Sequence, residues 1–302
     1  MATCLVTPRD IDILRALERS PLTVRQLLKL SETFAYPFTT ERRAQERLRQ
    51  LCAAGRLRRW FYATARQAAV SYFTLTPAGF QILHGPDARL PSRSCFGPVG
   101  IARQRHAHSL AEFLVHLIVA THRAQITIGH FHRENALCLR VGDETLYPDG
   151  AFELSAPGSG PFRFFVEMDN NSEKIRGTFS LDTWQRKIAI YERHQNACPE
   201  RFRVLAVTTA GNERVANILD CARALARNPR RSLVYGITLT AFLPESEPLQ
   251  IPCFRDHVGR DVSLLPPLPI GLPVSLDYSV STGAAALKVV SSAPCLEPIP
   301  QA

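Results

Sequence analysis

The 302-residue sequence has no run of about 20 apolar residues, the length that a membrane-spanning helix requires. Its first residues, Met1 to Cys4, carry no signal-peptide pattern. Both absences argue against a membrane or secreted protein, so we expect a soluble protein located in the cytoplasm. The hydrophobic content of 45% is sufficient for globular cores.

Cysteine patterns typical of disulfide frameworks or zinc sites are also lacking. The eight cysteines lie far apart between Cys4 and Cys295, with no Cys-x-x-Cys pair and no Cys/His cluster of zinc spacing. We therefore expect buried, reduced thiols, which agrees with a cytoplasmic location.

Positive charge is abundant and unevenly distributed. Residues 1–85 contain 13 Lys and Arg against 6 Asp and Glu, so this part carries +7 of the formal net charge of +9. Because 302 residues exceed the usual domain size of about 100 to 200, two domains are expected. A basic domain attracts polyanions, and we expect residues 1–85 to bind double-stranded DNA.

The order of elements in residues 1–85 is typical of a winged helix-turn-helix. Helix-start signals at Thr7, Thr23 and Thr39 or Thr40 precede apolar residues at helical spacing. Two strand-like segments, 57–62 and 70–75, then predict a wing. The third helix is the candidate for the major groove. The predicted DNA contacts are the arginines of that helix and of the first wing strand: Arg42, Arg43, Arg47, Arg49, Arg58 and Arg59.

Two other interpretations of this basic domain remain open. Winged helices also mediate protein contacts, and an arginine-rich helix is often no more than a solvated face.

A segment rich in Gly, Pro and Ser at residues 86–100 predicts a linker. The second domain, residues 101–243, alternates strands and helices, which predicts an α/β sheet covered by helices. From residue 244 onward the chain holds ten of its 22 prolines, which predicts a poorly ordered tail over 244–302. Within the second domain we expect helices at 102–123, 179–195 and 212–226, and strands at 125–131, 136–141, 145–154, 162–169, 202–209 and 233–242.

Acidic residues accompany two of the predicted strands, in Tyr147-Pro148-Asp149-Gly150 and in Phe164–Asp169. Strands are depleted in Asp and Glu, so Glu167 and Asp169 either lie at an exposed strand end or form a site. Alternation along the strand places both on one face, and an antiparallel hairpin would bring Asp149 beside Glu167. Three clustered carboxylates predict a Mg²⁺ site able to activate water for phosphodiester cleavage, with plain surface charge as the alternative.

The Pro148-Asp149 pair, the Glu-x-Asp motif of residues 167–169 and the αβββαβ order resemble the PD-(D/E)xK nuclease superfamily. This resemblance implies a restriction-endonuclease-like mixed α/β/α domain. It also implies that Asp149 and Glu167 bind a metal ion while a lysine assists the attacking water.

Further features make the resemblance more specific. The N-terminal winged helix, the segment from His106 to Leu110, and the segment from Lys187 to Tyr191 before the strand at 204–209 occur together with the acidic motifs. With these features in this order along the sequence, the chain resembles the replication-relaxation family of plasmid and mobile-element proteins over about residues 5–240.

The chain departs from the nuclease motif at its third position, where Asp169 stands in place of lysine. A lysine from the following helix can occupy the same space, and Lys187 is the main candidate, with Lys174 as the second. In a working enzyme we expect Asp169 to add a ligand or a supporting contact, and Glu112 on the entry helix to complete the metal site. An ordinary solvated lysine is the alternative for Lys187.

The entry helix also carries His106 and His108. They stand two residues apart, which is not the helical ligand spacing of three or four. We therefore expect both to be packed or hydrogen-bonded rather than metal ligands.

Three functions fit these features. The first is a DNA-binding accessory protein for plasmid or mobile-element replication, relaxation or mobilisation, whose nuclease-like domain binds DNA, a relaxase or a replication protein without cutting. The second is an active Mg²⁺-dependent nickase directed by the winged helix, and the third is a transcriptional regulator. The absent motif lysine favours the first. Convergence of Asp149, Glu167 and Lys187 would favour cutting, whereas a solvent-facing Lys187 would favour binding alone.

Overall fold

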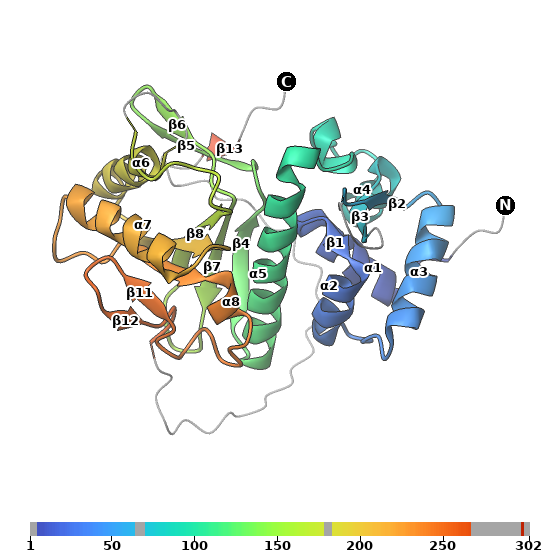
Figure 1. Ribbon diagram of the computed structural model, residues 1–302. Coiled ribbons are helices and arrows are strands. Elements are labelled where there is room, and N and C mark those ends of the chain that lie inside the picture. The colour runs from blue at the N-terminus through green and yellow to red at the C-terminus, as the bar shows by residue number, and fades with distance from the viewer. Residues whose placement is uncertain (1–4, 64–69, 178–182, 267–296, 299–302) are drawn as a thin grey trace.

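The computed structural model describes residues 5–63, 70–177, 183–266 and 297–298. Two α/β units lie side by side, with a long helix, α5, between them (Figure 1). We call residues 5–84 the N-terminal unit and residues 104–266 the C-terminal unit.

The N-terminal unit has the helices and the hairpin that its sequence predicts. The side chains of Thr23 and Thr40 cap the second and third helices by accepting hydrogen bonds from the backbone N–H groups of Gln26 and Arg43. A three-stranded antiparallel sheet, in the order β1-β3-β2, closes the unit. Its elements are α1 (Pro8–Arg19), β1 (Leu22–Thr23), α2 (Val24–Leu30), η1 (Ser31–Thr33), α3 (Glu41–Ala53), β2 (Leu57–Phe61), β3 (Ser71–Leu75) and α4 (Pro77–His84).

Two short 3-10 helices, η2 (Arg93–Phe96) and η3 (Ile101–Arg103), interrupt the irregular segment after α4. Phe96 of this segment is buried against the core of the N-terminal unit. The predicted linker is therefore docked on the N-terminal unit where Phe96 packs.

The C-terminal unit is built on a mixed seven-stranded sheet in the order β12-β11-β10-β9-β8-β7-β4. Strands β8, β9 and β10 are parallel neighbours, and the other pairings are antiparallel. Its elements are α5 (Gln104–Arg123), β4 (Thr127–His132), β5 (Leu137–Val141), β6 (Glu144–Leu146), β7 (Gly150–Ser155), β8 (Phe162–Asp169), α6 (Trp184–Ala197), β9 (Phe202–Thr208), α7 (Asn212–Leu225), β10 (Val234–Thr238), α8 (Leu239–Phe242), β11 (Phe254–Asp256) and β12 (Asp261–Val262).

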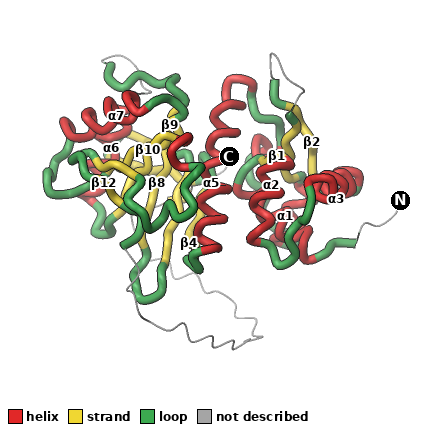
Figure 2. Tube along the Cα trace, turned by 60° about the horizontal axis from the view of Figure 1, so that its bottom comes forward, coloured by secondary structure: helices red, strands yellow, loops and turns green. Residues whose placement is uncertain are grey.

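Helices cover both faces of this sheet. On one face, α5 and α8 pack against alternate residues of the strands, among them Val166 and Met168 of β8. On the other face, α6 and α7 pack against the residues in between, such as Phe165. Figure 2 shows α6 and α7 together on the side away from α5. The side chains of Glu167 and Asp169 therefore belong to the α6 and α7 face, as the alternation predicted.

The long helix α5 is buried on two sides. Leu110, Phe113 and Leu117 pack against the sheet, whereas Ala111 and Val115 pack into the core of the N-terminal unit. Polar contacts reinforce the second side, where the Gln26 amide donates to Glu112 and Lys29 Nζ lies 2.9 Å from His116 Nδ1. The two units thus share one helix.

The structure differs from the sequence prediction at several element boundaries. The predicted strand at 145–154 is two strands, because Tyr147-Pro148-Asp149 separates β6 from β7. The predicted strand at 233–242 ends at Thr238, and its last residues form α8. For the helix predicted at 179–195, residues 179–182 lie outside the described residues, and α6 runs from Trp184 to Ala197.

The boundary predicted at residue 243 is too early. Strands β11 and β12 extend the main sheet, and Leu249, Leu264 and Leu265 are buried in its core, so the C-terminal unit reaches residue 266. Pro244, Pro248 and Pro252 lie in the segment between α8 and β11, and Pro266 follows β12. Within the predicted tail, β13 (Glu297–Pro298) pairs with β5, while residues 267–296 and 299–302 lie outside the described residues.

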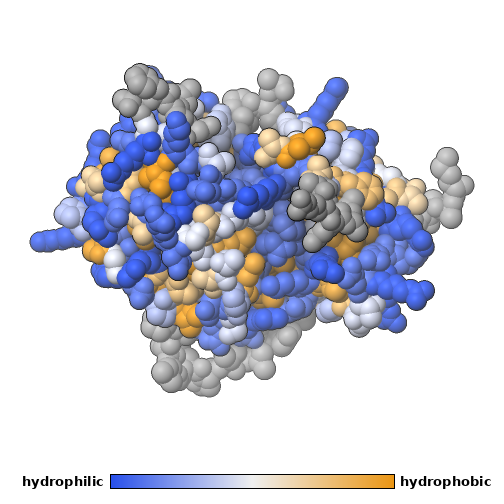
Figure 3. All heavy atoms as spheres, viewed as in Figure 1, coloured by the Kyte–Doolittle hydropathy of each residue, from blue (hydrophilic) through white to orange (hydrophobic). Residues whose placement is uncertain are grey.

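The face of the molecule seen in Figure 3 is covered mainly by hydrophilic side chains, and hydrophobic residues appear between them in small groups. Among the helices of the described residues, none has the length and hydropathy needed to cross a bilayer. The six cysteines within this part of the chain are free thiols.

Gly79 on α4 offers a test of the N-terminal packing. A Cβ at this position would meet the backbone carbonyl oxygen of Arg56, which has no freedom to move aside. We expect Gly79→Ala to lower the free energy of unfolding by about 1–3 kcal/mol in urea titrations. Gly100→Ala is the matched control, because a Cβ there has no atom within 4 Å. Equal stability of both variants would contradict this packing.

Candidate functional site

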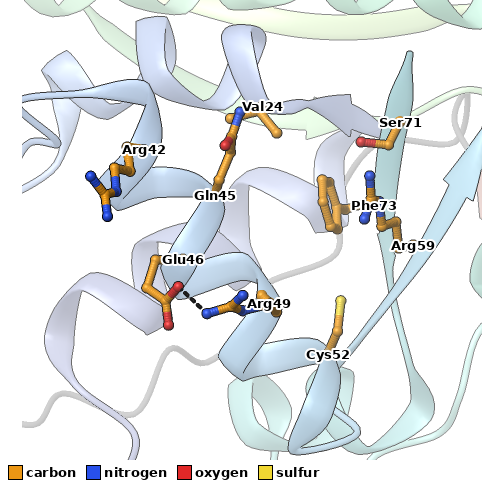
Figure 4. Close-up of a pocket in the computed structure, with 9 residues that line it drawn as sticks. All are labelled: Val24, Arg42, Gln45, Glu46, Arg49, Cys52, Arg59, Ser71 and Phe73. Carbon is orange, nitrogen blue, oxygen red and sulfur yellow. Dashed lines mark hydrogen bonds and ion pairs between the residues drawn. The ribbon is translucent and has the colours of Figure 1, made fainter. Parts of the chain in front are cut away.

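A groove of about 530 Å³ separates α3 from the β2–β3 hairpin (Figure 4). Arg42 and Arg49 approach it from α3, and Arg59 approaches it from β2. Arg49 forms an ion pair with Glu46 in this groove. The other lining residues are Val24, Gln45, Cys52, Ser71 and Phe73.

Five of the six arginines predicted to contact DNA are exposed, namely Arg42, Arg43, Arg49, Arg58 and Arg59. Together they give the α3 and hairpin surface a basic character.

Arg47 lies differently. Its guanidinium pairs with Asp10, a fully buried carboxylate on α1, and also donates to Gln50. Burial alone would raise the pKa of Asp10, but Arg47 and the hydrogen bonds from Thr7 lower it. Arg47 thus links α3 to α1.

In the C-terminal unit, the turn before β7 fixes Asp149 against β8. The backbone N–H of Asp149 donates to Val166 O at 3.0 Å, and the backbone N–H of Met168 donates to Asp149 Oδ2 at 2.7 Å. The antiparallel pairing of β7 and β8 continues this contact. The expectation that a hairpin brings Asp149 beside Glu167 is confirmed.

Glu167 is covered by two side chains of α6. Lys187 Nζ lies 2.8 Å from Glu167 Oε2, and the Tyr191 hydroxyl donates to Glu167 Oε1 at 2.6 Å. Lys187 and Tyr191 stand four residues apart and therefore project from the same face of the helix. Lys187 also contacts Glu173 Oε1 at 2.8 Å. Lys187 therefore points toward the sheet, where it meets Glu167, and not toward solvent.

Burial and neighbouring charges set the protonation of this group. Burial raises the pKa of Glu167 to about 7, and the charge of Asp149 adds to the rise while Lys187 and Tyr191 oppose it. For Lys187, burial alone would lower the pKa, but the carboxylates of Glu167, Glu173 and Asp149 raise it. Lys187 is thus held as a cation among acids.

A second group surrounds Asp149 on its other side. His106 Nε2, at the start of α5, lies 3.1 Å from Asp149 Oδ1 and 3.5 Å from an oxygen of Glu134 in the β4–β5 loop. The nitrogen is buried between the two carboxylates. Burial would lower the pKa of His106, whereas Asp149 and Glu134 raise it. Burial and the charge of Asp149 raise the pKa of Glu134.

These groups open into a cavity of about 640 Å³. Asp149, His106, Glu173 and Lys187 line it, whereas Glu167 lies behind them with 1% of its surface exposed. The remaining lining residues are mostly polar or basic: Ala102, Arg103, Asn135, Thr145, Leu146, Tyr147, Ser172, Lys174 and Arg186.

Asp169 lies on the same face of β8 but has other partners. Its carboxylate accepts hydrogen bonds from Trp184 Nε1 and Thr208 Oγ1. It also accepts two from the guanidinium of Arg214, through Nε and one Nη. Burial would raise the pKa of Asp169, but Arg214, Thr208 and Trp184 lower it. The carboxylate therefore anchors α6, β9 and α7 to the end of β8.

Two other predicted residues lie outside this group. Glu112 faces the N-terminal unit, where it accepts a hydrogen bond from Gln26 at 2.8 Å. Lys174 is exposed at the rim of the cavity, without a place beside Glu167. The structure therefore brings together Asp149, Glu167 and Lys187 among the predicted site residues.

Sequence reasoning missed three residues of this site. Glu134 and Glu173 lie in loops, where an acidic residue is ordinary, so no sequence signal singled them out. The neighbours of His106 come from elsewhere in the chain, so its spacing to His108 gives no sign of its place beside Asp149 and Glu134.

The family model described as replication-relaxation matches residues 14–201, which is more than half of the chain. No curated protein and no solved structure matches the chain. The match spans both units and includes His106, Glu134, Asp149, Glu167 and Lys187.

The pairing of Arg47 with Asp10 generates a prediction. We expect Arg47→Ala to lower the free energy of unfolding by about 3 kcal/mol at pH 7, because it leaves a buried carboxylate without its cation. A carboxylate whose pKa is lowered in the folded protein adds stability at pH values above its pKa in the unfolded chain. The stability difference between the wild type and Arg47→Ala should therefore shrink below about pH 4, as Asp10 takes up a proton. Urea titrations at several pH values measure this.

Arg43→Ala is the control, since Arg43 is exposed on the same helix. It should change stability by no more than about 0.5 kcal/mol. Equal stability of the two variants would return Arg47 to the set of DNA contacts.

Proposed function

The chain belongs to the replication-relaxation family, and we propose that it is a metal-dependent nickase acting on double-stranded DNA in plasmid or mobile-element replication, relaxation or mobilisation. The observation that carries the proposal is the convergence of Asp149 from the turn before β7, Glu167 from β8 and Lys187 from α6. Family membership alone supports the role in replication or relaxation. Cutting is our inference from the site.

Lys187 takes the role of the motif lysine that is absent at position 169. It reaches Glu167 from the helix that covers this face of the sheet. Because three carboxylates keep it protonated, it acts as a fixed positive charge rather than as a base. Such a charge stabilises the negative charge that develops when a phosphodiester is attacked.

Asp149 fits the role of a metal ligand. Its Oδ2 is fixed by the Met168 N–H, and its Oδ1 lies 3.1 Å from the buried Nε2 of His106. A divalent cation such as Mg²⁺, when bound there, would activate water and neutralise phosphate charge. Glu167 lies behind Asp149, where it holds Lys187 beside the site.

The cavity also carries groups suited to the DNA backbone. Arg103 and Lys174 line it beside Asp149, so positive charge surrounds the acidic centre. Phosphate oxygens are bound by such side chains without regard to base sequence. The site thus offers contacts to a phosphate strand next to a candidate cation position.

We assign the N-terminal unit the role of a winged helix that binds the target duplex. Its α3 and hairpin present exposed arginines around one groove, as expected for a helix entering the major groove with a wing beside it. Because α5 is shared by both units, bound DNA would have a defined position relative to the cavity.

A second candidate is the DNA-binding accessory protein that does not cut. The observation in its favour is Asp169, which replaces the motif lysine and is engaged with Arg214. The experiment below distinguishes the two.

The nickase proposal predicts metal-dependent conversion of supercoiled plasmid to the open-circular form. We expect Asp149→Asn to reduce the rate at least about 100-fold, and Lys187→Met to do likewise, because each removes charge from the reacting centre. Asp143→Asn, in the exposed turn between β5 and β6, is the control and should nick like the wild type.

Asp149→Asn is the deciding variant because it preserves side-chain shape, while Lys187→Met also leaves a buried glutamate unpaired. Absence of nicking by the wild-type protein with Mg²⁺ or Mn²⁺, together with salt-sensitive DNA binding, would leave the accessory function instead.

DNA binding by the N-terminal unit gives a separate prediction. Replacing Arg42 or Arg59 with alanine should weaken duplex binding and reduce the slope of log affinity against log salt by about one for each lost phosphate contact. Arg230→Ala, on an exposed loop of the C-terminal unit, is the control. Fluorescence anisotropy over a salt series measures the slopes. Unchanged slopes in Arg42→Ala and Arg59→Ala would refute this binding surface.

A further inference from the structure

Three potential metal ligands meet beside the cavity, whose wall includes two of them, His106 and Asp149. His106 Nε2, an oxygen of Glu134 and an oxygen of Asp149 all lie within 4.8 Å of one another. They come from the first turn of α5, from the β4–β5 loop and from the turn before β7. Three separate segments of the chain therefore place one nitrogen and two oxygens around a common centre.

The position of His106 supports a ligand role. Its Nε2 is buried and lies 3.1 Å from Asp149 Oδ1 and 3.5 Å from an oxygen of Glu134. A ring nitrogen within reach of two carboxylates from separate segments is placed as a third ligand beside them.

Glu167 does not compete for this position. Both of its oxygens accept hydrogen bonds, from Lys187 and from Tyr191, and it does not line the cavity. Asp149 has one oxygen held by the backbone and the other directed to His106. The cation site is therefore better completed on the His106 side of Asp149 than on the Glu167 side.

We propose that His106 and Glu134, together with Asp149, bind a divalent transition-metal ion, with Mn²⁺ preferred over Mg²⁺. The proposal rests on the proposed nickase function only in that Asp149 is shared. The ligand set gives the preference, because imidazole suits transition metals, whereas Mg²⁺ favours oxygen ligands alone. Three protein ligands also leave positions for water and a phosphate oxygen.

Arg103 is the natural competitor for this ion. Its guanidinium pairs with the Glu134 carboxylate, and its side chain is 55% exposed, so it has room to move away. A bound cation would take over Glu134 and release Arg103 at the cavity wall, where the guanidinium is suited to contact a phosphate. Removal of Arg103 should therefore strengthen cation binding.

The test is a direct measurement of Mn²⁺ binding to the full chain without DNA. Electron paramagnetic resonance of free Mn²⁺ gives the dissociation constant, and competition with Mg²⁺ gives the preference. We expect His106→Ala and Glu134→Gln each to weaken Mn²⁺ binding about 10-fold or more, and Arg103→Ala to tighten it several-fold. Folding of each variant is checked by circular dichroism and thermal unfolding.

Matched controls lie on the same helix. His108→Ala and Glu112→Gln alter a histidine and a glutamate of α5 that face the N-terminal unit, and they should bind Mn²⁺ like the wild type. Unchanged Mn²⁺ affinity in folded His106→Ala would overturn the proposal and leave His106 as a bridge between two acids. Mg²⁺ binding as tight as Mn²⁺ binding would also overturn it.

Failure of this site and failure of the nickase function give different results. His106-dependent Mn²⁺ binding without nicking would keep the metal site and refute the enzyme. Nicking that needs Asp149, combined with unchanged Mn²⁺ affinity in His106→Ala, would keep the enzyme and refute this ligand set.

Discussion

The burial of α5 on two sides is the constraint on which the rest of the structure depends. One side of the helix completes the core of the sheet, and the other completes the core of the N-terminal unit. Because α5 is apolar on both sides, separating the two units would expose apolar surface to water, at a large cost in free energy. Its first turn carries His106, so the packing that joins the units also fixes one wall of the cavity.

The second constraint is an excess of acidic side chains near the first turn of α5. Asp149, Glu167, Glu134 and Glu173 lie close together, and burial makes their mutual repulsion stronger than it would be in water. Lys187 neutralises the group on one side, and on the other Arg103 pairs with Glu134 and His106 lies beside it. Such an arrangement favours any additional cation that finds ligands, which links the fold to the proposed chemistry.

Local patterns predicted those parts of the structure that depend on local physics. The capping residues Thr23 and Thr40, the β2–β3 hairpin and the shared face of Glu167 and Asp169 all follow from spacing within one segment. Contacts between distant segments did not. The Asp10 partner of Arg47 lies 37 residues away, and the Gln26 partner of Glu112 lies 86 residues away, so neither role was visible in a single helix.

The same reasoning explains the different partners of Glu167 and Asp169 at the end of β8. Residues 167 and 169 share one face of the strand, and α6 covers that face, so a positive charge can reach Glu167 from either element. In this chain the helix supplies it, through Lys187. Position 169 is then available for an anchoring role, and Asp169 with Arg214 fixes α7 and β9 against β8. Asp169 thus stabilises the scaffold against which Lys187 packs.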